Sequence, residues 1–174
     1  KNTSLVRSVH AFKARYNTYF NGHEAYKEGV LLQEQGNRDN FTEVIPLYVT
    51  GNKATVKIGT GNFDRAVEKS QKAIKMHSIT KRPEWNKSRP KTAKDRIWLS
   101  QKEYNPFLWR AWFMMDEAQF RKGEYMEAAS TFAYIQRLYF SKPNLVARAR
   151  LLEARCYAEM EWFYDAEDLI SRAQ

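Results

Sequence analysis

Three arginines in the second half of the chain have the type and spacing that most directly suggest a chemistry. Arg148 and Arg155 are seven positions apart, and Arg110 stands 38 positions before Arg148. Residues seven apart lie two turns apart on one helix face, and a planar guanidinium donates to both oxygens of a carboxylate. The spacing therefore predicts a ridge that recognises acidic peptide segments. Two internal ion pairs would make these arginines unavailable to a ligand, namely Arg155 with Glu159 and Arg110 with Glu117.

Residues that could act as nucleophiles, bases or metal ligands are scattered. His10, His23 and His77 show no ligand spacing, and the chain contains no HExxH, P-loop or GxGxxG motif. The single Cys156 stands where Ala118 stands 38 positions earlier, so we expect it to pack in the core. We therefore predict a non-enzymatic protein with no catalytic residue, metal site, cofactor or small-molecule substrate.

The net charge of +9 is concentrated in two segments. Residues 1–20 contain four basic residues and no acid, and residues 81–96 contain seven basic residues against two acids. The basic residues of the second segment form the predicted basic patch: Lys81, Arg82, Lys87, Arg89, Lys91, Lys94 and Arg96. Such patches bind nucleic acid, anionic lipid or acidic protein. Trp85 and Trp98, interleaved with the charges, keep nucleic-acid binding as an alternative. The favoured interpretation is that they anchor the segment while its charges face water.

Length and apolar content favour one compact unit. A chain of 174 residues fits a single domain or a short helical array. One cysteine excludes an internal disulfide framework. No run of about 18 apolar residues occurs, so we expect no membrane-spanning helix.

An internal repeat with a spacing of 38 residues organises the second half of the chain. KGEYMEAASTFAYIQ, residues 122–136, aligns with MEWFYDAEDLISRAQ, residues 160–174, and TGNFDRAVEKSQKAI, residues 60–74, repeats the same pattern. A glycine would end one helix in a left-handed conformation, an aromatic residue would fill the angle between two helices, and an alanine would let them cross closely. Glu161 replaces the glycine in the last copy. The predicted repeat positions are Gly61, Phe63, Ala66, Gly123, Tyr125, Ala128, Phe132, Phe163 and Ala166.

This pattern resembles the tetratricopeptide repeat, a helical hairpin of about 34 residues. The resemblance is strongest in WRAWFMMDEAQFRKGEYMEAASTFAYI. It implies an all-α solenoid of stacked helical hairpins with a basic irregular insert. Within one array over 1–174, the expected units are a degenerate hairpin at 1–48, a half-repeat at 60–77, the insert at 78–106, and repeats at 107–142 and 144–174.

The first helix of each hairpin in such an array lines a concave groove that binds peptides. The resemblance therefore assigns the groove to two helices of this chain. The expected groove residues are Arg110, Phe113, Met114, Glu117, Arg121, Arg148, Leu151, Arg155 and Glu159. A generic peptide adaptor is one function consistent with this groove.

The aromatic stretch ARYNTYFNGHEAYKEG, residues 14–29, is predicted to belong to a helix over about 5–34. On a helical wheel the larger apolar residues fall on one side, and Asn17, Thr18, Asn21 and Gly22 fall on the other. We therefore expect the aromatic side in the core and Gly22 in solvent. The expected core side is Phe12, Tyr16, Tyr19, Phe20, His23, Tyr26 and Val30. The segment DNFTEVIPLY, residues 39–48, would supply the partner helix.

The order of ARYNTYFNG, IPLY, FDRAVEKSQKAIKMHSI and a tetratricopeptide unit resembles the amino-terminal region of the PorW/SprE family. These are tetratricopeptide-repeat lipoproteins of Bacteroidetes, associated with type IX secretion and gliding motility. The resemblance implies a periplasmic protein tethered to the outer membrane through an upstream lipidated cysteine. It also implies a scaffold role, with secretion and envelope proteins as the partners.

Overall fold

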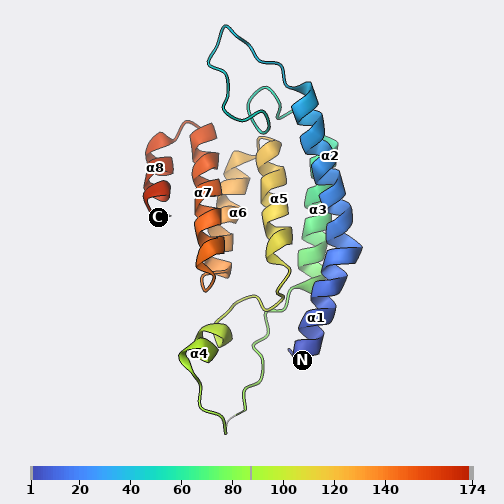
Figure 1. Cartoon of the computed structure of the whole chain (residues 1–174), viewed down its shortest axis with the longest axis vertical. Coiled ribbons are helices and arrows are strands. Elements are labelled where there is room, and N and C mark those ends of the chain that lie inside the picture. Colours follow the sequence, from blue (N-terminus) through green and yellow to red (C-terminus); the bar gives the residue numbers. More distant parts are fainter. Residues whose placement is uncertain (1, 87, 173–174) are drawn as a thin grey trace.

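The computed structural model describes residues 2–86 and 88–172, and these residues form helices and connecting segments with no strand among them (Figure 1). The protein is therefore all-α, as predicted. Its helices are α1 (Ser4–Lys13), the π-helix η1 (Ala14–Tyr19), α2 (Phe20–Gly36), α3 (Thr60–His77), α4 (Ala93–Leu99), α5 (Trp109–Arg121), α6 (Tyr125–Leu138), α7 (Pro143–Glu159) and α8 (Phe163–Ser171).

The helices form a row in which successive long helices run in opposite directions (Figure 1). α1, η1 and α2 follow one another as a continuous rod, and α3 returns along it. α5 packs against α3, and α6, α7 and α8 each pack against the preceding helix. Each pair covers the apolar side of its neighbour, so the core continues along the row.

The predicted helix over 5–34 is confirmed, because helical structure runs from Ser4 to Gly36. The predicted buried face is wrong in part: Tyr19, Tyr26 and Val30 do pack against the core as partly buried side chains, but the rest of the face does not. The helix instead buries its small or short side at Ala14, Thr18 and Gly22, followed by Ala25, Gly29 and Gln33. Of the residues predicted to be in the core, Phe12, Tyr16 and Phe20 are all more than half exposed.

Close helix packing explains the reversal. A Cβ added to Gly22 would lie 2.9 Å from the Cβ of Lys69, and one added to Gly29 would lie 2.9 Å from the ring of Phe63. The backbones of α2 and α3 therefore approach too closely for side chains of any size. In addition, η1 has wider turns than an α-helix, so a wheel with one fixed angle misplaces the residues that follow it.

The predicted partner helix over 39–48 is absent, and with it the predicted hairpin over 1–48. Residues 37–59 form a long connection without a helix, and α3 pairs with α2 instead. Pro46 lacks an amide hydrogen and restricts the residue before it, which disfavours a helix here. The predicted half-repeat at 60–77 therefore pairs with a preceding helix, α2, and the connection 37–59 separates the two in sequence.

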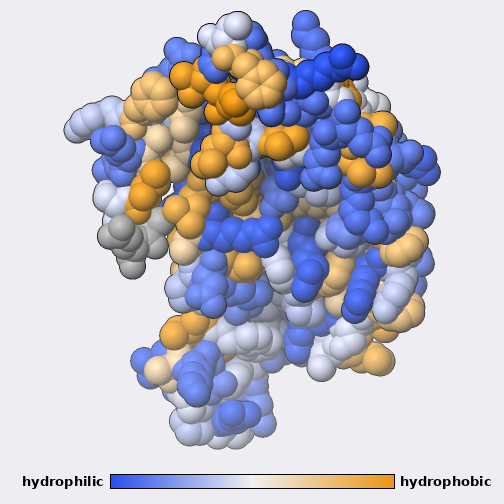
Figure 2. All heavy atoms as spheres, turned by 45° about the horizontal axis from the view of Figure 1, so that its top comes forward, coloured by the Kyte–Doolittle hydropathy of each residue, from blue (hydrophilic) through white to orange (hydrophobic). Residues whose placement is uncertain are grey.

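The connection 37–59 is held against the helix ends by a buried glutamine. The Gln33 amide donates to the Thr55 and Arg121 carbonyls, both at 2.9 Å, and its oxygen accepts from the Gly51 amide at 3.2 Å. Large apolar residues nevertheless remain exposed on the connection, including Phe41 and Val44. Figure 2 shows hydrophobic side chains gathered at this end of the molecule.

The predicted repeat positions are mostly confirmed. Ala66, Ala128 and Phe132 are buried, as are Phe63 and Ala166, and Gly123 has the left-handed φ of 82°. Two positions are wrong. Gly61 lies in the first turn of α3 with open space where a Cβ would stand, and the left-handed glycine here is instead Gly59, the N-cap of α3. Phe163 is 61% exposed and fills no angle between helices.

Glu161, at the position of the missing glycine, has a φ of 64°. This left-handed conformation costs a residue with a Cβ about 1 kcal/mol relative to glycine. We therefore expect Glu161→Gly to raise the free energy of unfolding by about 1 kcal/mol, measured by urea denaturation. The substitution also removes an exposed ion pair with Lys53 at 2.8 Å, which contributes little. Lys53→Ala is the control and should change stability by less than about 0.5 kcal/mol. A less stable Glu161→Gly variant would refute the strain argument.

The insert over 78–106 is less irregular than predicted. It contains α4, which begins at a capping box in which Thr92 and Asp95 bond each other's backbone amides. Its base is closed by the buried Glu103, whose carboxylate accepts from the Ser78 hydroxyl at 2.6 Å and from the Ile79 amide at 2.9 Å. The insert is therefore a closed loop tied to the row where α3 ends and α5 begins.

Candidate protein-binding groove

A cavity of about 160 Å³ opens on the face where η1 and α2, α5 and α7 meet. Five of the predicted groove residues line it together: Arg110, Phe113, Met114, Glu117 and Arg148. Of these, Phe113 and Met114 are almost fully buried and form its floor. The position of the groove on the first helices of successive pairs agrees with the prediction.

The groove also contains four residues that the sequence interpretation did not assign to it. Tyr19, His23 and Tyr26 come from the long amino-terminal helix, and Trp109 begins α5. The Tyr19 ring stacks on His23 with centroids 5.4 Å apart. Three of the four had been predicted as core residues, but the face that carries them borders the groove. The high density of aromatic residues in 14–29 is the sequence feature that could have assigned Tyr19, His23 and Tyr26 to the groove.

Glu117 is the carboxylate of the groove to which the neighbouring polar side chains bind. Its carboxylate pairs with Arg148 at 2.6 Å and accepts from the Tyr26 hydroxyl at 3.1 Å. That hydroxyl in turn accepts from Arg121 Nε at 2.9 Å. Burial, and then the charge of Glu117, raise the pKa of Tyr26 to about 12. This chain of contacts holds α2, α5 and α7 at a fixed separation.

The predicted ridge of three available arginines is therefore wrong in two of its members. Arg148 is occupied by Glu117, although the predicted internal partner of Glu117 was Arg110. Arg155 lies between the rings of Tyr48 and Phe120, with its guanidinium carbon 4.0 and 4.4 Å from their centroids. Its guanidinium also donates to the Thr50 carbonyl at 3.3 Å. The connection 37–59, which the prediction had made helical, brings Tyr48 and Thr50 to this place.

Arg110 is the ridge member that remains open. Its side chain is exposed and lies over the Trp109 ring at 4.6 Å. Among the described residues no carboxylate lies within ion-pair distance of it. A carboxylate entering the groove would therefore meet Arg110 first.

The other predicted groove residues lie beside this cavity. Arg121 and Arg155 line a second cavity of about 130 Å³ farther along α5, with Glu117 shared between the two. Glu159 lines a separate cavity under the connection 37–59. Leu151 is half exposed and lines neither of the cavities on α5.

The predicted basic patch lies on the insert, which Figure 1 shows extending below the row of long helices. Its described members are exposed, while Lys87 lies outside the described residues. Arg89 covers the Trp85 ring at 5.1 Å, and Arg7 of α1 covers the Trp98 ring at 5.1 Å. The tryptophan rings thus contact the protein's own cations.

The candidate nucleophile and metal ligands show no chemical constellation. Cys156 is fully buried, and burial raises the pKa of its thiol to about 12. His10 and His77 lie together with their Nδ1 atoms 3.4 Å apart, whereas His23 belongs to the groove. Within residues 2–86 and 88–172 no group of three or more potential ligands could hold a metal ion.

In the same ranges no helix is long and apolar enough to cross a membrane.

The fold and the groove define a class: an all-α protein of antiparallel helix pairs with an aromatic and arginine-lined groove across the first helix of each pair. No protein-family model matches the chain, and no curated protein matches it.

Proposed function

We propose that this protein is a tetratricopeptide-like helical array that binds a segment of another protein in the groove formed by η1, α2, α5 and α7. The observation that carries the proposal is the groove itself, in which exposed Arg110 stands beside aromatic rings over a buried apolar floor. Aromatic residues and arginines are the residue types that dominate binding energy at protein interfaces. The function is non-enzymatic binding.

The groove favours a peptide segment with one apolar side chain and one carboxylate. An apolar side chain fits between the aromatic rings of the groove walls, which are Tyr19 and Trp109. A neighbouring Asp or Glu would pair with Arg110, which needs no internal pair to be broken. Arg148 would contribute to such binding only by exchanging Glu117 for the ligand.

We further propose that the protein acts as the amino-terminal scaffold module of a periplasmic lipoprotein tethered to the outer membrane, similar to the PorW/SprE family. Its partners would be components of the secretion or gliding machinery. The support is the order of the sequence motifs along the whole chain together with the groove. A generic peptide adaptor without a secretion role is the alternative that shares the same groove.

Nucleic-acid binding through the basic insert is the less favoured alternative. Single-stranded nucleic acid binds where bases stack on available aromatic rings. The rings of Trp85 and Trp98 are already covered by Arg89 and Arg7.

Binding should be tested by pull-down from Bacteroidetes envelopes, with mass spectrometry and quantitative titration of each recovered partner. The groove variant carries Arg110→Glu and His23→Glu, two accessible positions whose change leaves the apolar floor intact. We expect this variant to lose at least tenfold in affinity for a recovered secretion or envelope component. The control, Arg96→Glu, reverses one positive charge on the insert and should bind as the parent does.

If the groove variant and the Arg96→Glu control recovered equal amounts of every partner, the groove would be excluded as the binding site. Recovery of partners from outside the envelope, with the same dependence on Arg110, would favour the generic adaptor. Salt-sensitive binding of single-stranded RNA that is lost in Arg96→Glu would instead favour the insert as the functional surface.

A further inference from the structure

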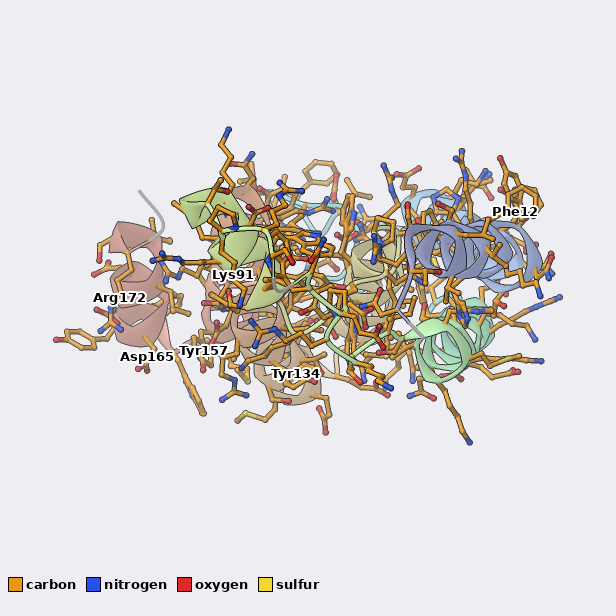
Figure 3. All side chains as sticks on the ribbon, turned by 90° about the horizontal axis from the view of Figure 1, so that it is seen from below. Phe12, Lys91, Tyr134, Tyr157, Asp165 and Arg172 are labelled. Atoms are coloured by element: carbon orange, nitrogen blue, oxygen red, sulfur yellow. The ribbon has the colours of Figure 1, made fainter. Side chains whose placement is uncertain are left out.

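The amino-terminal helix carries an exposed apolar stripe that runs along α1 and η1 to the start of α2. Its members are Leu5, Val9, Phe12, Tyr16 and Phe20, between 41% and 74% exposed. Phe12 and Tyr16 contact each other with ring centroids 4.7 Å apart. In Figure 3 the Phe12 side chain lies at the outer edge of α1 and points away from α3. The stripe is therefore an ordered apolar face that no described residue covers.

Cations border this stripe on both sides. Arg15 lies over the Tyr16 ring at 5.1 Å on one side, and Lys13 is exposed on the other. Residues 1–20 contain no acid at all. An apolar row between cations is the arrangement of helices that lie in the interface of anionic membranes.

A basic cavity of about 580 Å³ continues from the stripe toward α3. Val9 belongs to both features, and Lys13, Lys69 and Lys72 line the cavity with Met76. Glu68, at 3.2 Å from Lys69, is the one carboxylate that pairs there among the described residues. The cavity also contains His77, whose pKa is lowered by burial and by the charges of His10 and Lys13. The local potential is thus positive and suits an anionic group.

We propose that the stripe and the basic cavity together form a docking surface for an anionic lipid bilayer. The rings of Phe12, Tyr16 and Phe20 would lie at the headgroup level, where aromatic side chains are enriched. Lys13, Lys69 and Lys72 would contact the lipid phosphates. This surface is separate from the groove, so it can hold the molecule on a membrane while the groove binds its partner.

A bilayer explains the composition of the surface better than an acidic protein does. Three of the five stripe residues are aromatic, and only Val9 among the five lines a hollow, the basic cavity beside α3. Protein partners usually bury a central residue in such a hollow. A flat aromatic row flanked by lysine and arginine instead meets a flat, negatively charged surface.

Sedimentation with vesicles tests the proposal on the whole chain. We expect binding to vesicles of equal parts phosphatidylglycerol and phosphatidylcholine, and at least tenfold weaker binding to phosphatidylcholine alone, because each cation near an anionic surface contributes about fivefold. Phe12→Ser with Tyr16→Ser, and separately Lys69→Gln with Lys72→Gln, should each reduce binding at least about tenfold.

Two controls separate this surface from other exposed residues. Val44→Ser, which removes a residue that is 95% exposed on the distant connection, should leave vesicle binding unchanged. Circular dichroism should show the same helix content in every variant, since all the substituted aromatic side chains are largely exposed.

Failure to bind either vesicle would overturn the proposal, as would equal binding to both. If a polyglutamate chain bound with the same dependence on Phe12 and Lys72 while vesicles did not, the surface would be a protein interface and the proposal would be wrong. None of these results changes the expectation for the groove.

Discussion

The free energy of unfolding is expected to fall by about 1.4 kcal/mol for each pH unit between about pH 5 and pH 8 through a single residue, Asp116. Asp116 is fully buried in α5, and neither of its carboxylate oxygens has a hydrogen-bond partner. Burial, opposed in part by nearby Thr131 and aided by the charge of Glu117, raises the pKa of this carboxyl to about 9. Asp116 is therefore protonated in the folded protein at neutral pH.

The sign of the effect follows from proton binding. In the unfolded chain Asp116 has an ordinary pKa of about 3.9 and is ionised above it. Between that value and the folded pKa, folding requires uptake of one proton, so stability is lost as the pH rises. The loss begins above about pH 4 and is complete near pH 9. Above that range the contribution no longer changes.

Asp116→Asn isolates this contribution. Asparagine has the same shape and no ionisable proton, so the variant should lose the slope and become more stable than the parent by several kcal/mol at about pH 8. Urea denaturation across the pH range measures it. Asp168→Asn, which changes an exposed carboxylate paired with Arg172, is the matched control and should keep the parental slope. An unchanged slope in Asp116→Asn would show that the carboxyl ionises normally in the fold.

Gly59→Ala is expected to destabilise the protein by roughly 3 kcal/mol, from the sum of two effects. Gly59 has a φ of 70°, a left-handed conformation that costs alanine about 1–2 kcal/mol. The added Cβ would also lie 3.0 Å from the Gly29 carbonyl oxygen and 3.2 Å from its Cα. Both are backbone atoms of α2, so the helices would have to separate.

Gly61→Ala, two residues later, is the matched control. Gly61 lies in the first turn of α3, and a Cβ there would meet nothing within 4 Å. Alanine should therefore be neutral or stabilise by about 0.5 kcal/mol, since it restricts the unfolded chain. Thermal and urea denaturation of the two variants give the comparison. Equal stability of the two variants would contradict the close approach of α2 and α3 at Gly59.

Local patterns predicted the elements of the second half correctly. Ala128 and Ala166 were identified as crossing positions because a repeated small residue between larger ones indicates close helix contact, and both are buried. Gly123 was identified by the same reasoning. These assignments succeed because each depends only on one helix and its immediate neighbour.

The first half was predicted less well because its packing depends on distant residues. The wheel placed Phe12 and Phe20 in the core on hydrophobicity alone, whereas the close approach of α3 selects Gly22 and Gly29. Nothing within residues 39–48 indicates that Tyr48 covers Arg155, which lies more than 100 positions later. Five of the nine predicted groove residues therefore share one cavity, but Arg148 and Arg155 already have contacts within the protein.

The connection 37–59 changes how this row of helices must fold. Arrays whose units touch only their neighbours can unfold one end at a time. Here Gln33 of α2 reaches Arg121 of α5, and Thr50 of the connection reaches Arg155 of α7, so the connection links the first helix pair to later helices. Such long-range contacts raise the contact order, which slows folding. They should also make the whole row melt in one cooperative transition rather than by fraying from its carboxyl-terminal helix.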